Sequence, residues 1–211
     1  GDNMMQSIKL CPKVKQNDFS GKQKRVGILG GSFNPPHVAH LIMAEQARVQ
    51  LNLDKIYFMP SHIPPHVDEK KTIDANYRVE MTQLAIRDNY HFELETIELE
   101  RPEKSYSFDT IQLLKEKNPD VDYYFIIGGD MVDYLPTWHR IDELVHEVQF
   151  VGVCRPGYPK ETPYPVLWIE APQMEISSTQ IRKNVLWGQS IRYLIPESVE
   201  EYIFEKGLYQ E

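Results

Sequence analysis

The chain has 211 residues, 41% of them hydrophobic, which suits one large α/β domain or a domain with a small appendage. Its 23 Lys and Arg against 31 Asp and Glu give a formal net charge of −8, which argues against a broad nucleic-acid-binding surface but not against a local pocket for an anion. No apolar run approaches the length of a membrane span, so we expect no membrane partner. Cys11 and Cys154 are too few for a disulfide framework, which favours a cytoplasmic location.

Residues 1–23 are polar and show no sustained periodicity. Gly1-Asp2-Asn3 stands before two methionines and resembles the remnant of an expression tag. We therefore predict an N-terminal tail over 1–23, made of this remnant and an extension, and one folded domain over 24–211.

Strand and helix patterns alternate along the remaining chain. We expect strands at 26–29, 55–59, 92–99, 123–127, 149–153 and 166–169, and helices at about 38–51, 75–86, 108–118, 177–187 and 197–206. The segment 138–147 is expected to be helical or part-helical. This order predicts an α/β fold: a Rossmann-like, doubly wound, mostly parallel sheet with helices on both faces and a small C-terminal helical portion. Ligands of such sheets bind beyond the carboxyl ends of the strands.

The first strand runs into Gly30-Gly31, a proline-rich turn and a helix that opens with His37 and His40. Paired glycines let backbone amides approach a ligand, and a helix start attracts anions, so this stretch predicts a phosphate site. It matches neither G-x-G-x-x-G nor the P-loop pattern. Two alternatives remain open: the histidines are a turn and a core residue, or they join His62 and His66 around a metal.

A second cluster lies at Ser177, Ser178 and Arg182. Its hydroxyls and amides can hold another phosphate at a helix start, and a guanidinium donates paired hydrogen bonds to phosphate oxygens. The alternative is a serine-capped helix with a solvated arginine.

Four further candidates each have a structural alternative. Asp130 can accept from ribose hydroxyls or cap a turn, and Trp138 can stack on a flat ring or pack in the core. Ser105-Tyr106-Ser107 can donate to a ligand or cap a helix, and Arg155 can contact a nucleotide or lie on the surface. No side chain has the pattern of an activated nucleophile, which favours direct transfer between two phosphorylated substrates.

Two of these stretches carry a family resemblance. GGSFNPPHVAH at 30–40 resembles the H-x-G-H signature of the nucleotidyltransferase α/β-phosphodiesterase superfamily, and ISSTQIR at 176–182 resembles its S-S-T-x-x-R signature. Within the superfamily the chain is similar to bacterial nicotinate-nucleotide adenylyltransferases over roughly 24–208. Supporting stretches are PSHIPPH at 60–66, Arg101 with 105–107, GGDM at 128–131 and Trp138.

Three positions depart from the family pattern. Ala39 replaces a glycine, Ser107 replaces a usual threonine, and Val67 stands where a lysine is common. We leave open whether Lys70 or Lys71 takes over that lysine's contact.

The resemblance implies adenylyl transfer from ATP to nicotinate mononucleotide in NAD biosynthesis, with Mg²⁺ bridging substrate phosphates and no metal held by the protein. It assigns catalysis to His37, His40 and Arg182. It assigns ATP binding to Gly30, Gly31, Ser32, Phe33, Gly128, Asp130, Arg155, Ile176, Ser177 and Ser178, and nicotinate mononucleotide binding to Ser105, Tyr106, Ser107 and Trp138.

The alternatives are an adenylyl- or cytidylyltransferase with another phosphorylated acceptor, and a non-catalytic nucleotide sensor. The preference between nicotinate and nicotinamide mononucleotide stays open, as do a homo-oligomeric state and the role of residues 1–23.

Overall fold

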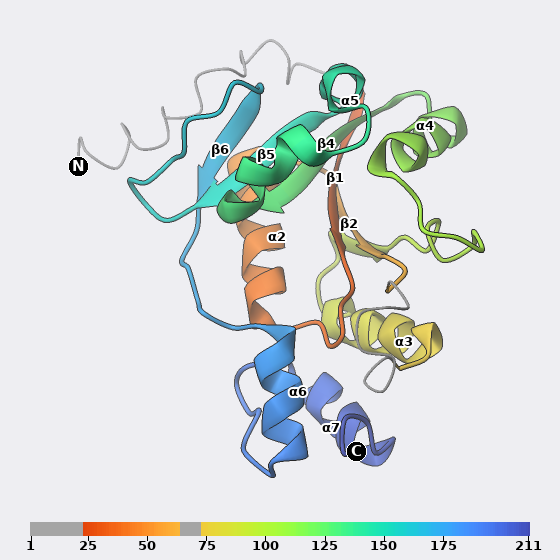
Figure 1. The fold of residues 1–211 in the computed structure, drawn as a ribbon, viewed down its shortest axis with the longest axis vertical. Helices are drawn as coiled ribbons and strands as arrows, with labels where there is room; N and C mark the ends of the chain where they lie inside the picture. The colour runs from red at the N-terminus through yellow and green to blue at the C-terminus, as the bar shows by residue number, and fades with distance from the viewer. Residues whose placement is uncertain (1–22, 64–72) are drawn as a thin grey trace. The chain divides into compact units, whose positions relative to one another are not determined.

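A computed structural model describes residues 23–63 and 73–211 of the chain (Figure 1). Its elements are β1 (Lys24–Gly31), α2 (Val38–Gln50), β2 (Lys55–Pro60), α3 (Ala75–Ile86), β3 (Phe92–Leu94), α4 (Ser107–Lys117), β4 (Val121–Gly128), the 3₁₀ helix η3 (Gly129–Thr137), α5 (Ile141–Glu147), β5 (Gln149–Cys154), β6 (Val166–Glu170), α6 (Ser178–Leu186) and α7 (Glu197–Glu205). None of the helices in these ranges is long and apolar enough to cross a membrane.

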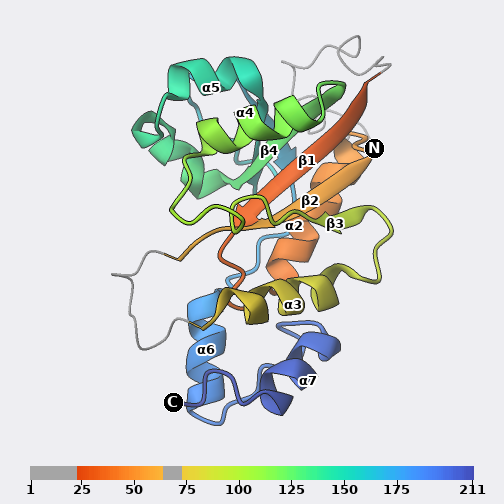
Figure 2. The same ribbon diagram turned by 90° about the vertical axis from the view of Figure 1, so that its right-hand side faces the viewer.

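The sheet has six strands in the order β3-β2-β1-β4-β5-β6, and β1 with β4, β4 with β5 and β5 with β6 are parallel. The chain starts near the middle at β1, moves outward to β3 and then returns to build the other side. This order is that of a doubly wound sheet. Figures 1 and 2 show α2 on one face and α4 with α5 on the other. The predicted Rossmann-like α/β fold is therefore confirmed.

The chain divides into two compact units. Among the described residues, unit 1 consists of 23–29, 42–57 and 106–173, and unit 2 of 30–41, 58–63, 73–105 and 174–211. The prediction of a single domain over 24–211 stays a prediction, and the predicted tail over 1–23 lies almost wholly outside the described residues.

The core of unit 1 is built on β4 and β5. All five residues of Tyr123–Ile127 are buried, as the apolar run predicts. Position 152 of β5 requires glycine because the Trp168 ring lies close to its backbone: a Cβ added there would stand 2.7 Å from the ring. The bare backbone at this position lets the two neighbouring strands share a buried tryptophan.

Unit 2 contains α3, α6, α7 and the turns that carry the sequence signatures. Helix α3 begins after Asp74, whose side chain accepts from the Asn76 N–H at 2.8 Å, as expected for an N-cap. Helix α7 packs on α3, where the Tyr202 hydroxyl donates to Glu80 and the Ser198 hydroxyl to the Leu84 carbonyl.

Two local predictions are wrong and a third is confirmed. The strand expected over 92–99 ends at Leu94, because the N–H groups of Leu99 and Glu100 turn back to the Thr96 carbonyl. The segment 138–147 is part-helical as expected, because α5 occupies Ile141–Glu147 and Trp138 lies between η3 and α5. The first strand, expected to end at Leu29 before the two glycines, instead includes Gly30 and Gly31.

Candidate functional site

His37 and His40 lie together at the start of α2 in unit 2. Their rings stack with centroids 3.7 Å apart and an interplanar angle of 25°. The His37 backbone N–H donates to Nδ1 of His40 at 3.0 Å, while the His37 carbonyl accepts from the His40 N–H at 3.1 Å. The first of these bonds is one half of a capping box, with His40 in the place usually taken by Glu or Gln, and the second is a backbone bond of the first helical turn.

The capping bond fixes the tautomer of His40. Because Nδ1 accepts a hydrogen bond, the single proton of the neutral ring lies on Nε2, which becomes a donor. Burial lowers the pKa of His37 to about 4, and burial together with the neighbouring His37 lowers the pKa of His40 to about 3. Both rings are therefore neutral at pH 7, and Nδ1 of His37 is buried with no hydrogen-bond partner.

The turn that leads into this helix, Ser32–His37, is here called the signature loop. Phe33 is buried with a φ of 48°, in the left-handed region that a phenylalanine rarely adopts. Its ring meets the His40 ring edge-on with centroids 5.0 Å apart. Backbone strain of this kind persists where the surrounding packing holds it, which marks the loop as a constrained segment.

The second signature cluster contacts the first. The Ser178 hydroxyl, in the first turn of α6, donates to the Pro35 carbonyl at 2.7 Å across 143 residues of sequence. Arg182 donates from its guanidinium to the Asn34 carbonyl at 2.8 Å. Ser177 caps α6 by accepting from the Gln180 N–H at 3.1 Å. Ser178 and Arg182 are thus gathered with His37 and His40 in unit 2, and the solvated-arginine alternative does not describe Arg182.

Two residues of this cluster were missed in the sequence. Arg78 of α3 is 2% exposed and donates from one nitrogen to the carbonyls of Ser32 at 2.7 Å and Ser61 at 2.8 Å. Its Nε has no partner. A signal existed, because Arg78 shares the helical spacing of the buried residues Met81 and Ala85.

The other missed residue is Tyr209, whose hydroxyl donates to Oδ1 of Asn34 at 2.5 Å. No local pattern in the sequence marks it, because its partner lies 175 residues away.

In unit 1, the aromatic candidates lie near the start of α4. Trp138 is half-buried, and Phe125 and Phe150 meet it edge-to-face with centroids 5.5 Å and 5.6 Å away. Tyr106, the N-cap of α4, stacks on His139 with centroids 4.2 Å apart. Ser107 is the first residue of α4, so Tyr106 and Ser107 stand at a helix start beside the segment that carries Trp138.

The polar candidates of unit 1 are more exposed. Asp130 opens η3 with its side chain 99% exposed, and Nζ of Lys160 lies 3.4 Å from its carboxylate and 2.8 Å from that of Asp133. Arg155 is exposed in the turn after β5, and Gly128 ends β4. Lys160 was not singled out in the sequence.

The remaining candidates lie in unit 2. Gly30 and Gly31 end β1, Ser32 is exposed, and Ile176 precedes the cap of α6. Ser105 is half-buried and its hydroxyl has no partner.

The segment named in the metal alternative is only partly described. Nε2 of His62 lies 2.6 Å from the Arg101 carbonyl, whereas His66, Val67, Lys70 and Lys71 fall outside the described residues. Over the described ranges, no group of three or more His, Cys, Asp or Glu side chains is placed to hold a metal ion.

Chemically, the unit 2 cluster is a set of hydrogen-bond donors. It offers a neutral imidazole N–H, the N-terminus of α6 and the remaining N–H groups of two guanidinium groups, and it includes no carboxylate among these named contacts, whereas the one proton of the Ser178 hydroxyl is donated to the Pro35 carbonyl. Such a set suits an anion with several oxygens, and it lacks the paired nucleophile and base of covalent catalysis.

Comparison with known proteins identifies a matching family model, close relatives in sequence and a solved structure with a similar fold. A family model described as cytidylyltransferase-like matches residues 28–184. A "probable nicotinate-nucleotide adenylyltransferase" of Enterococcus faecalis is 61% identical over 189 residues, which cover 90% of this chain and 86% of the relative. A protein of the same name from Lactiplantibacillus plantarum is 60% identical over 188 residues, which cover 89% of each chain. Plasmodium falciparum nicotinic acid mononucleotide adenylyltransferase, solved with NaAD, superposes with a TM-score of 0.73 at 22% identity over 88% of this chain and 97% of that one, a likeness of fold.

Proposed function

Since the chain belongs to the cytidylyltransferase-like family, and within it to the nicotinate-nucleotide adenylyltransferases, we propose that it transfers the adenylyl group of ATP to nicotinate mononucleotide. The products are the deamido dinucleotide and pyrophosphate. The observation that carries the proposal is the junction of the signature loop with α6 through Ser178 and Arg182. It brings together two groups of donors that lie far apart in sequence, which supports a single anion site.

The reaction needs placement more than acid–base chemistry. A phosphate oxygen of the mononucleotide attacks the α-phosphorus of ATP, the bond between the α-phosphorus and the bridging oxygen breaks, and pyrophosphate leaves with the electron pair. A phosphate monoester has a second pKa of about 6 and is largely ionised at pH 7, so no general base is required. Donors fixed in advance at the α-phosphate and the leaving group supply the stabilisation.

The tautomer of His40 gives it a defined role. Its Nε2–H donates to an α- or β-phosphate oxygen as negative charge builds there, without a proton being transferred. The backbone N–H groups of Ser178 and its neighbours at the start of α6, together with the guanidinium of Arg182, hold the β- and γ-phosphates, while the Ser178 hydroxyl keeps its bond to Pro35. The buried His37 supports the ring of His40 by stacking on it.

Unit 1 supplies the candidates for the bases and sugars. Trp138, which is half-buried and packed against Phe125 and Phe150, stacks on the pyridine ring. Ser107 and the amides at the start of α4 read the nicotinate carboxylate, and Asp130 accepts from ribose hydroxyls.

The residues around the signature loop are compatible with a Mg²⁺ ion that is held by the substrate and not by the protein. The named contacts around the signature loop are donors, whereas Mg²⁺ prefers hard oxygen ligands, so phosphate oxygens and water would coordinate it. When bound, it neutralises part of the phosphate charge. A cytoplasmic location remains a prediction of the sequence.

A pyrophosphate-release assay tests the proposal. We expect release with ATP and nicotinate mononucleotide, with nicotinamide mononucleotide as a second acceptor whose relative kcat/KM defines the preference. Phosphopantetheine with ATP and glycerol phosphate with CTP serve as controls for other branches of the family. Turnover only with one of the control pairs would overturn the assignment of nicotinate mononucleotide as the acceptor. Tight ATP binding without turnover on any acceptor would instead identify a nucleotide sensor.

A further inference from the structure

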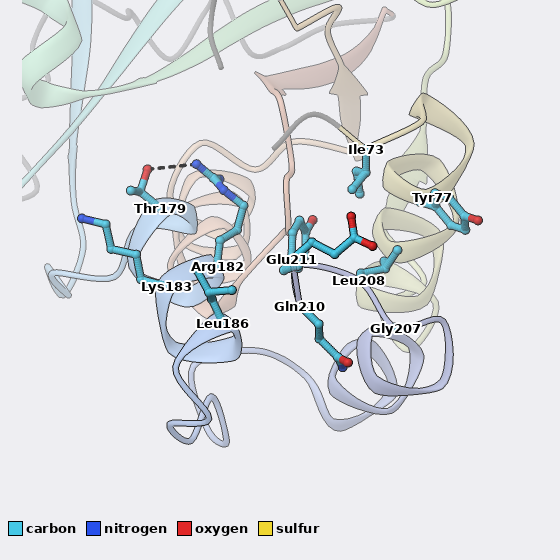
Figure 3. Close-up of a pocket in the computed structure, with 11 residues that line it drawn as sticks. Ile73, Tyr77, Thr179, Arg182, Lys183, Leu186, Gly207, Leu208, Gln210 and Glu211 are labelled. Atoms are coloured by element: carbon cyan, nitrogen blue, oxygen red, sulfur yellow. Dashed lines mark hydrogen bonds between the residues drawn. The ribbon is translucent and has the colours of Figure 1, made fainter. Parts of the chain in front are cut away.

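The segment after α7 contacts the signature loop through one side chain. Residues 207–211 line a cavity of about 440 Å³ in unit 2, together with Thr179, Arg182 and Lys183 of α6 and the start of α3. Figure 3 shows Arg182, bonded to Thr179, on one side of this cavity and Gly207, Gln210 and Glu211 on the other. The segment therefore lies beside a residue assigned to phosphate binding.

The conformation of this segment is fixed at several points. Gly207 and Tyr209 both have a φ of 64°, and Leu208 between them is buried. A left-handed conformation is unfavourable for tyrosine and persists only where the surroundings hold it. Phe33 has the same kind of strain at the other end of the contact. Two strained residues thus flank Asn34, the residue that joins them.

Asn34 connects Tyr209 to the phosphate donors. Its Oδ1 accepts from the Tyr209 hydroxyl at 2.5 Å, and its backbone carbonyl accepts from Arg182 at 2.8 Å. It is 6% exposed, so water does not readily replace either bond. Burial raises the pKa of Tyr209, while nearby Arg182 and Arg78 act in the opposite direction, and the hydroxyl keeps the proton that it donates.

We infer that Tyr209 is a positioning residue for adenylyl transfer, which holds Asn34 and thereby sets the placement of Arg182 and of the loop that carries His37. The inference rests on the proposed function. It assigns no contact with substrate to Tyr209. Its hydroxyl acts through Asn34, and the conformation of residues 207–209 aims it there.

The test is Tyr209→Phe in the full chain, which removes one hydroxyl and keeps the ring. We expect kcat/KM for ATP to fall by about tenfold if the bond is fully used in the transition state, because tenfold corresponds to about 1.4 kcal/mol, within the range of one neutral hydrogen bond. The KM for nicotinate mononucleotide should stay within about twofold, and Tm should fall by about 2–4 °C, because one hydrogen bond of the folded state is lost while packing is retained. A purely structural role would lower Tm and leave the kinetics of the folded enzyme unchanged.

Tyr202→Phe is the matched control. Tyr202 also lies in unit 2 and also donates a buried hydroxyl bond, but to Glu80 on α3 and not to the signature loop. We expect wild-type kinetics from this variant. Wild-type kinetics for Tyr209→Phe, or the same loss in both variants, would overturn the inference.

A second measurement isolates the path through Asn34. In an Asn34→Ala background, Tyr209→Phe should cause less than about a twofold further loss, because the acceptor is already gone. A full tenfold further loss would show that Tyr209 acts by another route.

Measuring ATP binding by calorimetry keeps the test of the positioning role of Tyr209 separate from the test of the proposed adenylyl transfer. A wild-type chain that releases no pyrophosphate with any acceptor defeats the proposed function. ATP binding about tenfold weaker in Tyr209→Phe than in Tyr202→Phe would then still support the positioning role, and equal binding would defeat it.

Discussion

The two groups of predicted site residues are held in different ways. In unit 2, His37, His40 and Arg182 are tied to one loop by stacking and by hydrogen bonds to its backbone. In unit 1, Asp130 and Arg155 project from turns with exposed side chains. A donor already fixed in place contributes more to a transition state than one that must first be ordered. The difference therefore predicts a gradient of effects, steepest in unit 2.

The largest effect is expected at His40. Replacing it with alanine removes the oriented Nε2–H, and one such donor typically supplies about 3 kcal/mol of transition-state stabilisation, so kcat should fall by a hundredfold or more. Steady-state kinetics with circular dichroism as a check on folding measures this. His146→Ala, an exposed histidine of α5, is the control. Turnover close to wild type in His40→Ala would remove the histidine from the mechanism.

A middle-sized effect concerns the pH dependence of stability. Burial lowers the pKa values of His37 and His40 to about 4 and about 3, below the ordinary value of 6.5. Below pH 6.5 the unfolded chain therefore binds protons that the folded chain does not. Stability is fully present above pH 6.5 and decreases as the pH falls toward 4, by on the order of 1–2 kcal/mol per histidine between pH 7 and pH 5.

Urea unfolding at pH 7 and pH 5 measures this loss. The difference between the two pH values should shrink in His37→Gln and in His40→Gln and persist in His146→Gln. An unchanged difference in the first two variants would show that the stacked pair is not the source.

Much of the fold was predictable because its signals are local. Most strands and helices lie within a few residues of the expected positions, since an apolar run and a helical period are read over ten or so residues. The exceptions have local causes too. The strand after Phe92 ends where backbone N–H groups turn to Thr96, and η3 forms over a segment with Pro136 where no periodic pattern exists.

The site was only partly predictable, for a different reason. The sequence singled out His37, His40, Ser178 and Arg182 as separate clusters, but not what fixes them. Asn34, Arg78 and Tyr209 act through backbone carbonyls and an amide oxygen. Such bonds depend on where distant segments meet, which no spacing along the chain encodes.

The smallest effect is expected at Asp130. Its fully exposed carboxylate lies near Lys160 and makes an ordinary surface ion pair. Asp130→Asn should change kcat/KM for ATP by less than about threefold, because exposed charges are well solvated and weakly coupled. Kinetics at low and moderate salt provide the measurement. A loss of tenfold or more would mean that exposure is a poor guide to importance in unit 1, and the gradient between the units would fail.

The bonds from Ser178, Arg182 and Tyr209 to the signature loop also have a consequence for folding. They span 143, 148 and 175 residues of sequence. Bringing together residues that are so distant in sequence costs more chain entropy than forming the local turns of α2 or α6. Long-range contacts of this kind slow folding. We expect the loop to be ordered late, after the strands and helices have formed. During refolding, catalytic competence should then lag behind secondary structure.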